Sequence, residues 1–259
     1  MKNIALVTEY DGTAFHGWQS QKGLRNVQDE LAKAISRCTG EAVRLTGCSR
    51  TDAGVHAAGH VSNFFTESRI PVEKLPLALN SHLPADIAVL GAAVVPDAFH
   101  ARFSATGKRY RYRILYSPTR PVLERHRVCH VIHRMDEVNM LRAAAMLEGT
   151  HDFRAFMASG GEAKTTVRTI HSLQLSHQGP ALDILVHGDG FLYNMVRIIA
   201  GTLYYVGIGR IAAEEIPAIL ASGDRRRAGK TLPAHGLTLE EVFYEENLLQ
   251  SVHCFAYDS

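Results

Sequence analysis

Cysteine is scarce in this chain: its 259 residues include four cysteines, none of them in a CxxC pair. They are widely scattered, at Cys38, Cys48, Cys129 and Cys254. Disulfide frameworks belong to short, cysteine-dense secreted chains, and structural zinc sites use closely spaced ligands. The spacing therefore argues against both a disulfide framework and a structural zinc site.

Long hydrophobic runs are also missing. The longest weakly charged segment, 191–208, still contains Asn194, Arg197 and Thr202, whereas a membrane span needs about 20 predominantly apolar residues. We therefore expect a buried helix there and no membrane partner. The apolar start of the chain is interrupted by Glu9, which argues against a signal peptide. A cytoplasmic protein is the expectation, and its net charge of +2 permits a nucleic-acid partner without requiring one.

Cofactor motifs are the third absence. The chain has neither a GxGxxG loop nor a Walker loop, so nothing in it predicts a nucleotide cofactor. His56 and His60 have the i, i+4 spacing of a zinc-binding pair, but the glutamate of an HExxH motif is missing between them. A metal-dependent hydrolase based on these two histidines is one alternative. The expectation is an activity that needs no metal and no cofactor.

The hydrophobic pattern predicts strand, helix, strand, strand, helix, strand, followed by a second round of similar order with one additional short helix. The first round has strands at 3–10, 42–48, 60–66 and 86–95, with helices at 26–38 and 73–82. The second has strands at 106–116, 165–176, 182–188 and 238–244, with helices at 136–148, 191–206 and 212–221. Two β-α-β-β-α-β halves are a known supersecondary arrangement.

Small and polar residues crowd into the segment 47–56, which predicts a loop between two strands. The loop contains Arg50 and Asp52, and catalytic groups concentrate on loops that a rigid sheet holds in place. Alternatively, the two side chains pair with each other or cap a turn, which is common for a surface aspartate.

Aromatic and basic residues alternate along the predicted strand 106–116. In a strand, its tyrosines and its arginines point to opposite faces. The two faces hold Lys108, Tyr110, Tyr112 and Ile114 on one side, and Arg109, Arg111 and Arg113 on the other. This pattern suits RNA, because bases stack on aromatic rings while cations meet phosphates. The alternative is a half-buried strand with a solvated arginine face.

Arg197 is the only charged residue of the segment 191–208. A buried guanidinium is costly unless a carboxylate or several acceptors meet it. Asp52 is a candidate partner. The alternatives are that Arg197 reaches solvent or pairs with a structural acid.

Short segments along nearly the whole chain match one protein family in order. They are Tyr10-Asp11-Gly12, Phe15-His16-Gly17-Trp18-Gln19 with Gln21, Val27-Gln28, Arg50-Thr51-Asp52-Ala53-Gly54-Val55-His56, Leu83-Pro84-Ala85-Asp86-Ile87, Phe99-His100-Ala101-Arg102-Phe103-Ser104-Ala105, Lys108-Arg109-Tyr110-Arg111-Tyr112, His151-Asp152-Phe153, Thr166-Val167-Arg168-Thr169-Ile170 and Met195-Val196-Arg197. On these segments the chain resembles the tRNA pseudouridine synthase A family.

The resemblance implies an α+β fold of two fused ferredoxin-like halves. Together they form one mostly antiparallel, eight-stranded sheet with helices on one face and an active-site cleft, and the family is usually homodimeric. The halves are expected at 1–105, which carries the catalytic aspartate, and at 106–247. The tail 248–259 has no assignment.

The resemblance also implies an isomerase that converts uridine to pseudouridine at positions 38–40 of the tRNA anticodon arm, without a cofactor. Asp52 occupies the position of the catalytic carboxylate. Tyr110 matches the tyrosine that packs on the target base, Arg50 helps to hold the flipped nucleotide, and Arg197 pairs with the aspartate. Further candidates for RNA binding are Arg102, Lys108 and Arg109.

The chemistry is compatible with these residue types. Uracil must leave C1′ through N1, rotate and rejoin through C5, which involves no redox change and no group transfer. An ionised carboxylate in a dry pocket is sufficient as nucleophile or base, and a flipped base needs an aromatic floor. The main alternative is a non-catalytic RNA-binding protein, which would keep the Tyr–Arg strand but would not need Asp52.

Overall fold

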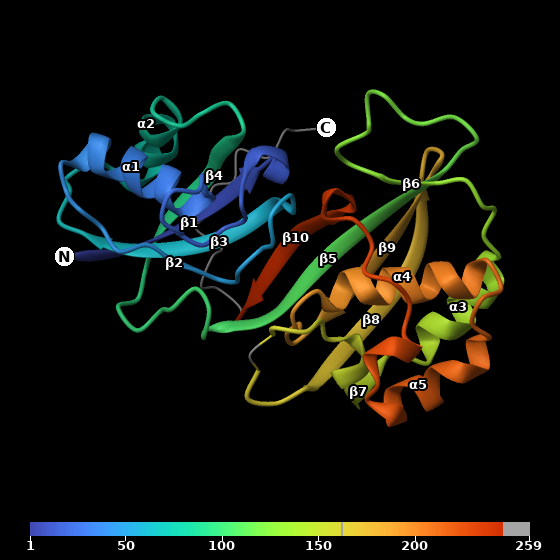
Figure 1. Cartoon of the computed structure of the whole chain (residues 1–259). Helices are drawn as coiled ribbons and strands as arrows, with labels where there is room; N and C mark the ends of the chain where they lie inside the picture. Colours follow the sequence, from blue (N-terminus) through green and yellow to red (C-terminus); the bar gives the residue numbers. More distant parts are fainter. Residues whose placement is uncertain (162, 246–259) are drawn as a thin grey trace. The chain divides into compact units, whose positions relative to one another are not determined.

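The computed structural model describes residues 1–161 and 163–245, which fold as two compact units (Figure 1). Unit 1 contains Met1–Thr106 and the described residues from Leu239 onward, and unit 2 contains Gly107–Thr238. Helices and mostly antiparallel strands make up both units, which confirms the predicted α+β class. The division into domains ending at 105 and 247 stays a prediction, and the tail 248–259 lies outside the described residues.

The sheet of unit 1 is built around β1 (Lys2–Tyr10), which pairs antiparallel with β3 (His56–Thr66) and β4 (Ile87–Val95). The short β2 (Thr46–Gly47) pairs with β3, and β10 (Leu237–Tyr244) is also a neighbour of β3. In chain order this unit therefore runs β-α-β-β-α-β, as the hydrophobic pattern predicts.

Two helices, α1 (Val27–Thr39) and α2 (Leu75–Asn80), lie together on one face of this sheet (Figure 1). The predicted bounds of α1 are confirmed because both caps are present. The Asn26 side chain accepts the Asp29 backbone N–H, and Gly40 ends the helix with a left-handed φ of 76°. The inward residues of α1 are fully buried: Leu31, Ala34 and Ile35.

Three predicted elements of unit 1 are wrong in extent. The strand predicted at 60–66 begins four residues earlier, as β3. The strand predicted at 42–48 shrinks to β2, and the backbone just before it bonds to a side chain at Leu45. Gln28 Nε2 donates to the Leu45 carbonyl at 2.8 Å, and the Glu41 carboxylate accepts the Thr66 hydroxyl at 2.7 Å. The helix predicted at 73–82 consists of a 3₁₀ turn at Val72–Lys74 followed by α2.

The sheet of unit 2 has the antiparallel order β5 (Ala105–Tyr116), β9 (Ala181–Gly188), β8 (Val167–Gln178) and β7 (Gly149–Asp152). The short β6 (Cys129–Val131) pairs parallel with β5. Neither β6 nor β7 was predicted, because three or four residues carry no readable alternation.

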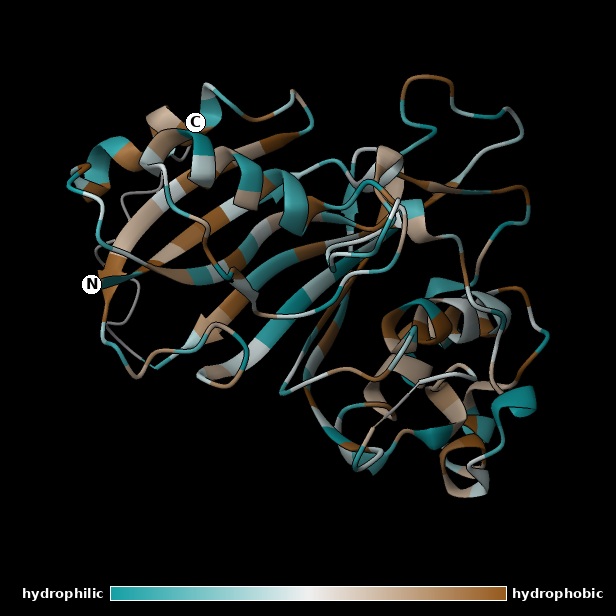
Figure 2. Cartoon of the chain, turned by 60° about the vertical axis from the view of Figure 1, so that its left-hand side comes forward, coloured by the Kyte–Doolittle hydropathy of each residue, from teal (hydrophilic) through white to brown (hydrophobic). Residues whose placement is uncertain are grey.

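Three helices belong to unit 2: α3 (Glu137–Ala145), α4 (Met195–Gly207) and α5 (Ile216–Ser222). In the described part of the chain, no helix is long and apolar enough to cross a membrane. Hydrophobic bands run along the strands of each unit (Figure 2). The helix predicted from residue 191 begins only at Met195, because Asn194 before it is left-handed, with φ 60°. An L-residue in that conformation cannot continue an α-helix backward.

Candidate functional site

Asp52 lies in the loop that joins β2 to β3, as the sequence predicts. Its side chain is half-buried, between a buried Thr51 and an exposed turn at Ala53. The Val55 N–H donates to the Asp52 carbonyl at 3.1 Å, which closes the turn. Arg50 is in the same loop and is exposed.

A second loop, residues 11–26 between β1 and α1, holds the backbone on both sides of Asp52. The Trp18 N–H donates to the Thr51 carbonyl at 3.2 Å, and the Gly54 N–H donates to the Phe15 carbonyl at 3.2 Å. The hydroxyls of Tyr10 and Thr51 are 2.8 Å apart in a buried hydrogen bond. The residues next to Asp52 are therefore fixed from one side by the loop 11–26.

Glycines allow this loop to approach so closely. A Cβ on Gly12 would lie 2.0 Å from the Val55 carbonyl oxygen, and one on Gly17 would lie 2.2 Å from the Thr51 carbonyl oxygen. Real Cβ contacts of this length do not occur, and Gly17 also has a left-handed φ of 85°. Both positions therefore require glycine for the Asp52 loop to keep its place.

An ion pair braces the loop 11–26 itself. Arg25 binds Asp86 with two hydrogen bonds, of 2.7 and 2.9 Å, and its guanidinium lies 4.1 Å from the centre of the Phe15 ring. The hydrogen bonds to Asp86 raise the pKa of Arg25 above its ordinary value. A bidentate arginine–carboxylate pair fixes orientation as well as position.

The two histidines considered as zinc ligands bond to the backbone of their own unit instead. His56 Nδ1 accepts the Gly12 N–H at 3.0 Å, and His60 Nε2 lies 3.1 Å from the Ser49 carbonyl oxygen. Among residues 1–161 and 163–245, no three His, Cys, Asp or Glu side chains are grouped so that they could hold a metal ion. The metal-dependent alternative therefore has no donor set in the described residues.

Tyr110 lies on β5 in unit 2, and its ring meets Phe191 edge-on with centroids 5.2 Å apart at 85°. The ring is only 7% exposed. Its neighbours Lys108 and Arg109 are half-buried and exposed, respectively. The stacking role of Tyr110 stays a prediction.

The other tyrosine and the other arginines of β5 have structural partners. Tyr112 is fully buried, donates its hydroxyl to the Pro233 carbonyl at 2.8 Å, and has its pKa raised by burial. Arg113 binds the buried Asp183 at 2.8 and 2.9 Å, and Arg111 lies 3.8 Å from the same carboxylate. Asp183 therefore accounts for the charges of Arg111 and Arg113 within the unit, and the RNA interpretation of this strand stays a prediction.

Arg197 is half-buried on α4, and hydrogen bonds to neutral acceptors orient its guanidinium. Nε donates to the Leu232 carbonyl at 2.8 Å, and Nη1 donates to the Asn194 side-chain oxygen at 2.6 Å. Asn194 is the one non-glycine residue with positive φ in the described part of the chain. Backbone strain of this kind clusters at functional sites. Sequence reasoning missed Asn194, although its place three residues before the lone charge of the helix was a usable signal.

Arg102 is exposed in unit 1, in the turn that follows β4. Its guanidinium lies 5.6 Å from the centre of the Phe103 ring, which is 76% exposed and 4.3 Å from the His100 ring. An exposed aromatic ring beside a cation is a suitable surface for single-stranded nucleic acid.

The arginine run at 225–227 serves its own loop. Arg225 donates to the Gly229 carbonyl at 2.8 Å and to the Thr231 hydroxyl at 3.0 Å. Arg226 pairs with Asp224 at 2.8 Å. These contacts explain two charges of the run without an external phosphate.

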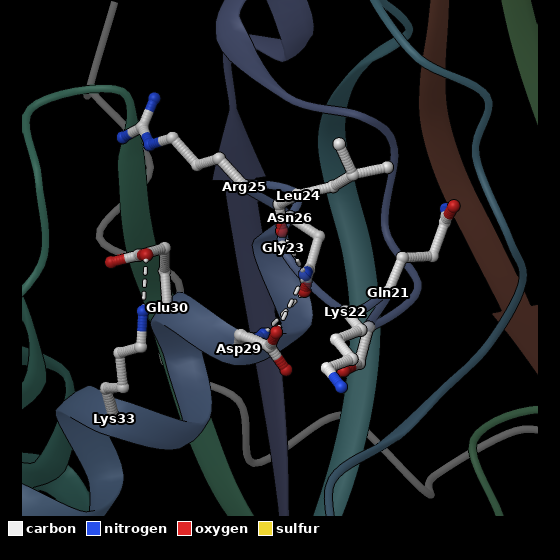
Figure 3. Close-up of a pocket in the computed structure, with 10 residues that line it drawn as sticks. Gln21, Lys22, Gly23, Leu24, Arg25, Asn26, Asp29, Glu30 and Lys33 are labelled. Atoms are coloured by element: carbon white, nitrogen blue, oxygen red, sulfur yellow. Dashed lines mark hydrogen bonds and ion pairs between the residues drawn. The ribbon is translucent and has the colours of Figure 1, made fainter.

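A polar pocket of about 360 Å³ opens beside the start of α1 (Figure 3). Two pairs at its wall bond to each other: Asn26 with Asp29, and Lys33 with Glu30. The pocket contains none of the predicted site residues, so it is not the candidate site.

Comparisons with known proteins agree with one another. A family model described as tRNA pseudouridine synthase matches residues 6–104 and 143–245. A tRNA pseudouridine synthase A of Acetivibrio thermocellus is 53% identical, and the match covers 94% of this chain and 100% of the relative. Proteins of the same name from Ruminiclostridium cellulolyticum and a Thermoanaerobacter species are each 50% identical, also over 94% of this chain and 100% of the relative.

The chain is also similar in structure to a chain of an H/ACA RNP bound to a substrate RNA containing 2′-deoxyuridine. It aligns with a TM-score of 0.42 at 10% identity, over 93% of this chain and 49% of that chain. This chain thus spans about half the length of that one.

Proposed function

Since the chain belongs to the tRNA pseudouridine synthase family and is an isomerase that acts on tRNA, we propose that it modifies uridines 38–40 of the anticodon arm with Asp52 as the catalytic carboxylate. The observation that carries the proposal is the anchoring of the Asp52 loop. Backbone hydrogen bonds at Thr51 and Gly54 flank this one half-buried carboxylate. A carboxylate that acts as nucleophile or base has to be held in a fixed position toward its substrate.

The remaining roles follow from the geometry of each residue. Arg50 is exposed, lies two residues before Asp52 in the same loop, and is proposed to hold the flipped nucleotide. Arg197 carries a pre-oriented guanidinium and is proposed to bind substrate, while its pairing with Asp52 stays a prediction. Tyr110 is proposed as the aromatic floor for the base. Phosphate contacts are proposed for Arg102, Lys108 and Arg109.

Family membership favours an enzyme over a non-catalytic RNA-binding protein. The anchored carboxylate favours it too, because only an enzyme needs one. The anticodon stem-loop as the bound part of tRNA, a homodimer, and a cytoplasmic location stay predictions.

Two substitutions at Asp52 test the proposal. Asp52→Asn keeps the size of the side chain and removes its charge, and Asp52→Ala removes the group. Both should lower pseudouridine formation by at least about a thousandfold, within the range expected for loss of an acid–base group. Affinity for tRNA should change less than about fivefold, because phosphate contacts dominate binding.

The matched control is Asp97→Asn, which removes an exposed carboxylate from another turn of unit 1. It should leave turnover unchanged. Pseudouridine should be mapped by position in a tRNA with uridine at 38, 39 and 40. Turnover by Asp52→Ala near the wild-type rate would assign the chemistry to another residue, and modification at other positions would reject the proposed target.

A further inference from the structure

His60 is a fully buried histidine in the middle of β3. Its ring stacks on the Trp18 ring, with centroids 3.6 Å apart and planes 21° from parallel. The centre of the Tyr10 ring lies 6.0 Å from that of the His60 ring.

The hydrogen bond of His60 fixes its tautomer. Nε2 lies 3.1 Å from the Ser49 carbonyl oxygen, and a carbonyl can only accept, so Nε2 carries the hydrogen and donates it. Nδ1 is then an acceptor, and within the described residues it has no hydrogen-bond partner. Thr8, directly across the β1–β3 ladder from His60, also has a buried hydroxyl without a partner there.

Packing alone does not explain a histidine at this position. A buried acceptor without a partner destabilises the folded state. Phenylalanine would fill a similar volume and stack on Trp18 without that penalty. What phenylalanine lacks is the donor to Ser49, which is three residues before Asp52.

The hydrogen bond to Ser49 completes a set of anchors on this loop. The Ser49 carbonyl is held by His60, and the Thr51 carbonyl is held by the Trp18 N–H at 3.2 Å. Arg50 therefore lies between two fixed carbonyls, and Asp52 follows directly. Because His60 also stacks on Trp18, the two anchors are mechanically linked.

We propose that His60 is a positioning residue, which orients Arg50 and Asp52 by fixing the Ser49 carbonyl and which does not touch the substrate. The inference rests on the proposed role of Asp52 and deepens it. It predicts that replacing the imidazole by an apolar ring lowers turnover without lowering the stability of the protein.

Three variants test this, each measured for thermal unfolding and for kcat and KM with tRNA. His60→Phe keeps the stacked ring and removes both nitrogens, so the midpoint of unfolding should stay equal or rise. Its kcat should fall about 10- to 100-fold, the effect expected of a misplacement below or near 1 Å, while KM stays within about twofold. Loss of folding stability alone would not produce this split.

His60→Gln and His60→Asn are a matched pair: both introduce a side-chain amide, and the Gln side chain is longer by one methylene group. The Gln amide nitrogen takes the place of Nε2 and can donate to Ser49, whereas the Asn amide falls short. Turnover by the Gln variant should therefore exceed that of the Asn variant by about tenfold. This comparison holds even where His60→Phe fails to fold.

Wild-type kcat in folded His60→Phe, or equal turnover of the Gln and Asn variants, would overturn the positioning role. Failure of the proposed function looks different. In that case the wild-type protein forms no pseudouridine at 38–40, or Asp52→Ala keeps its activity, whatever the His60 variants do.

Discussion

Two glycines of the loop 11–26 allow the anchoring of Asp52 to be measured with an internal control. Gly17 has φ 85°, and a Cβ there would lie 2.2 Å from the Thr51 carbonyl oxygen. Gly23 has nearly the same φ, 80°, and a Cβ there would meet nothing within 4 Å. Gly17→Ala and Gly23→Ala therefore share the backbone penalty, and only Gly17→Ala adds the collision with Thr51.

The expected sizes follow from these values. Alanine in a left-handed conformation costs about 1–2 kcal/mol, which lowers the melting midpoint of a chain of this size by about 2–8 °C. In Gly17→Ala the Thr51 carbonyl must also retreat by more than about 1 Å to reach ordinary contact at 3.4 Å, and a shift of about 1 Å already can lower turnover about a hundredfold. Gly23→Ala should keep kcat within about twofold, since nothing near Asp52 has to move.

The assay is single-turnover conversion of uridine in tRNA. The melting curve of each variant shows whether it is folded at the temperature of the assay. The informative quantity is the ratio of the two rates, because the shared backbone penalty cancels in it. Equal rates for folded Gly17→Ala and Gly23→Ala would refute the claim that this loop positions Asp52.

Two further predictions concern substrate contacts. Tyr110 is buried against Phe191, so leucine is a better replacement than alanine because it avoids a large cavity. Tyr110→Phe should keep tRNA turnover, whereas Tyr110→Leu should lose about five- to a hundredfold in kcat/KM because base stacking is lost. Equal defects in the two variants would point to the hydroxyl. Arg102→Ala should weaken tRNA binding and reduce the slope of log affinity against log salt by about one. The control is Arg226→Ala, which should leave affinity and slope unchanged because the Arg226 guanidinium already pairs with Asp224. An unchanged slope in Arg102→Ala would remove this residue from the phosphate contacts.

The longer elements could be predicted because local signals agree with the fold. The cap at Asn26, the apolar face of α1 and the stop at Gly40 all act within a few residues of one another. The strand predicted at 42–48 failed for the opposite reason. The Leu45 carbonyl bonds to the side chain of Gln28, 17 residues away in the sequence, and no periodicity of the segment reports that contact.

For Asp52, the sequence predicts a loop and a candidate carboxylate, but not what holds them. Gly12 and Gly17 look like ordinary turn glycines until the carbonyls of Val55 and Thr51 are placed beside them. Such contacts join segments more than thirty residues apart. Only the folded structure distinguishes a glycine needed for a turn from one needed for a close approach.

The same reasoning applies to His60. The sequence shows only its spacing from His56, whereas the structure shows which group its ring bonds to. The i, i+4 spacing to His56 is compatible with a shared metal ion only if both rings turn toward one point. Instead Nδ1 of His56 accepts from Gly12, while Nε2 of His60 donates toward Ser49. These two ring nitrogens are therefore bonded to different loops. Gly12 lies against the Val55 carbonyl, and Ser49 belongs to the Asp52 loop itself. Both hydrogen bonds therefore contribute to the placement of the carboxylate.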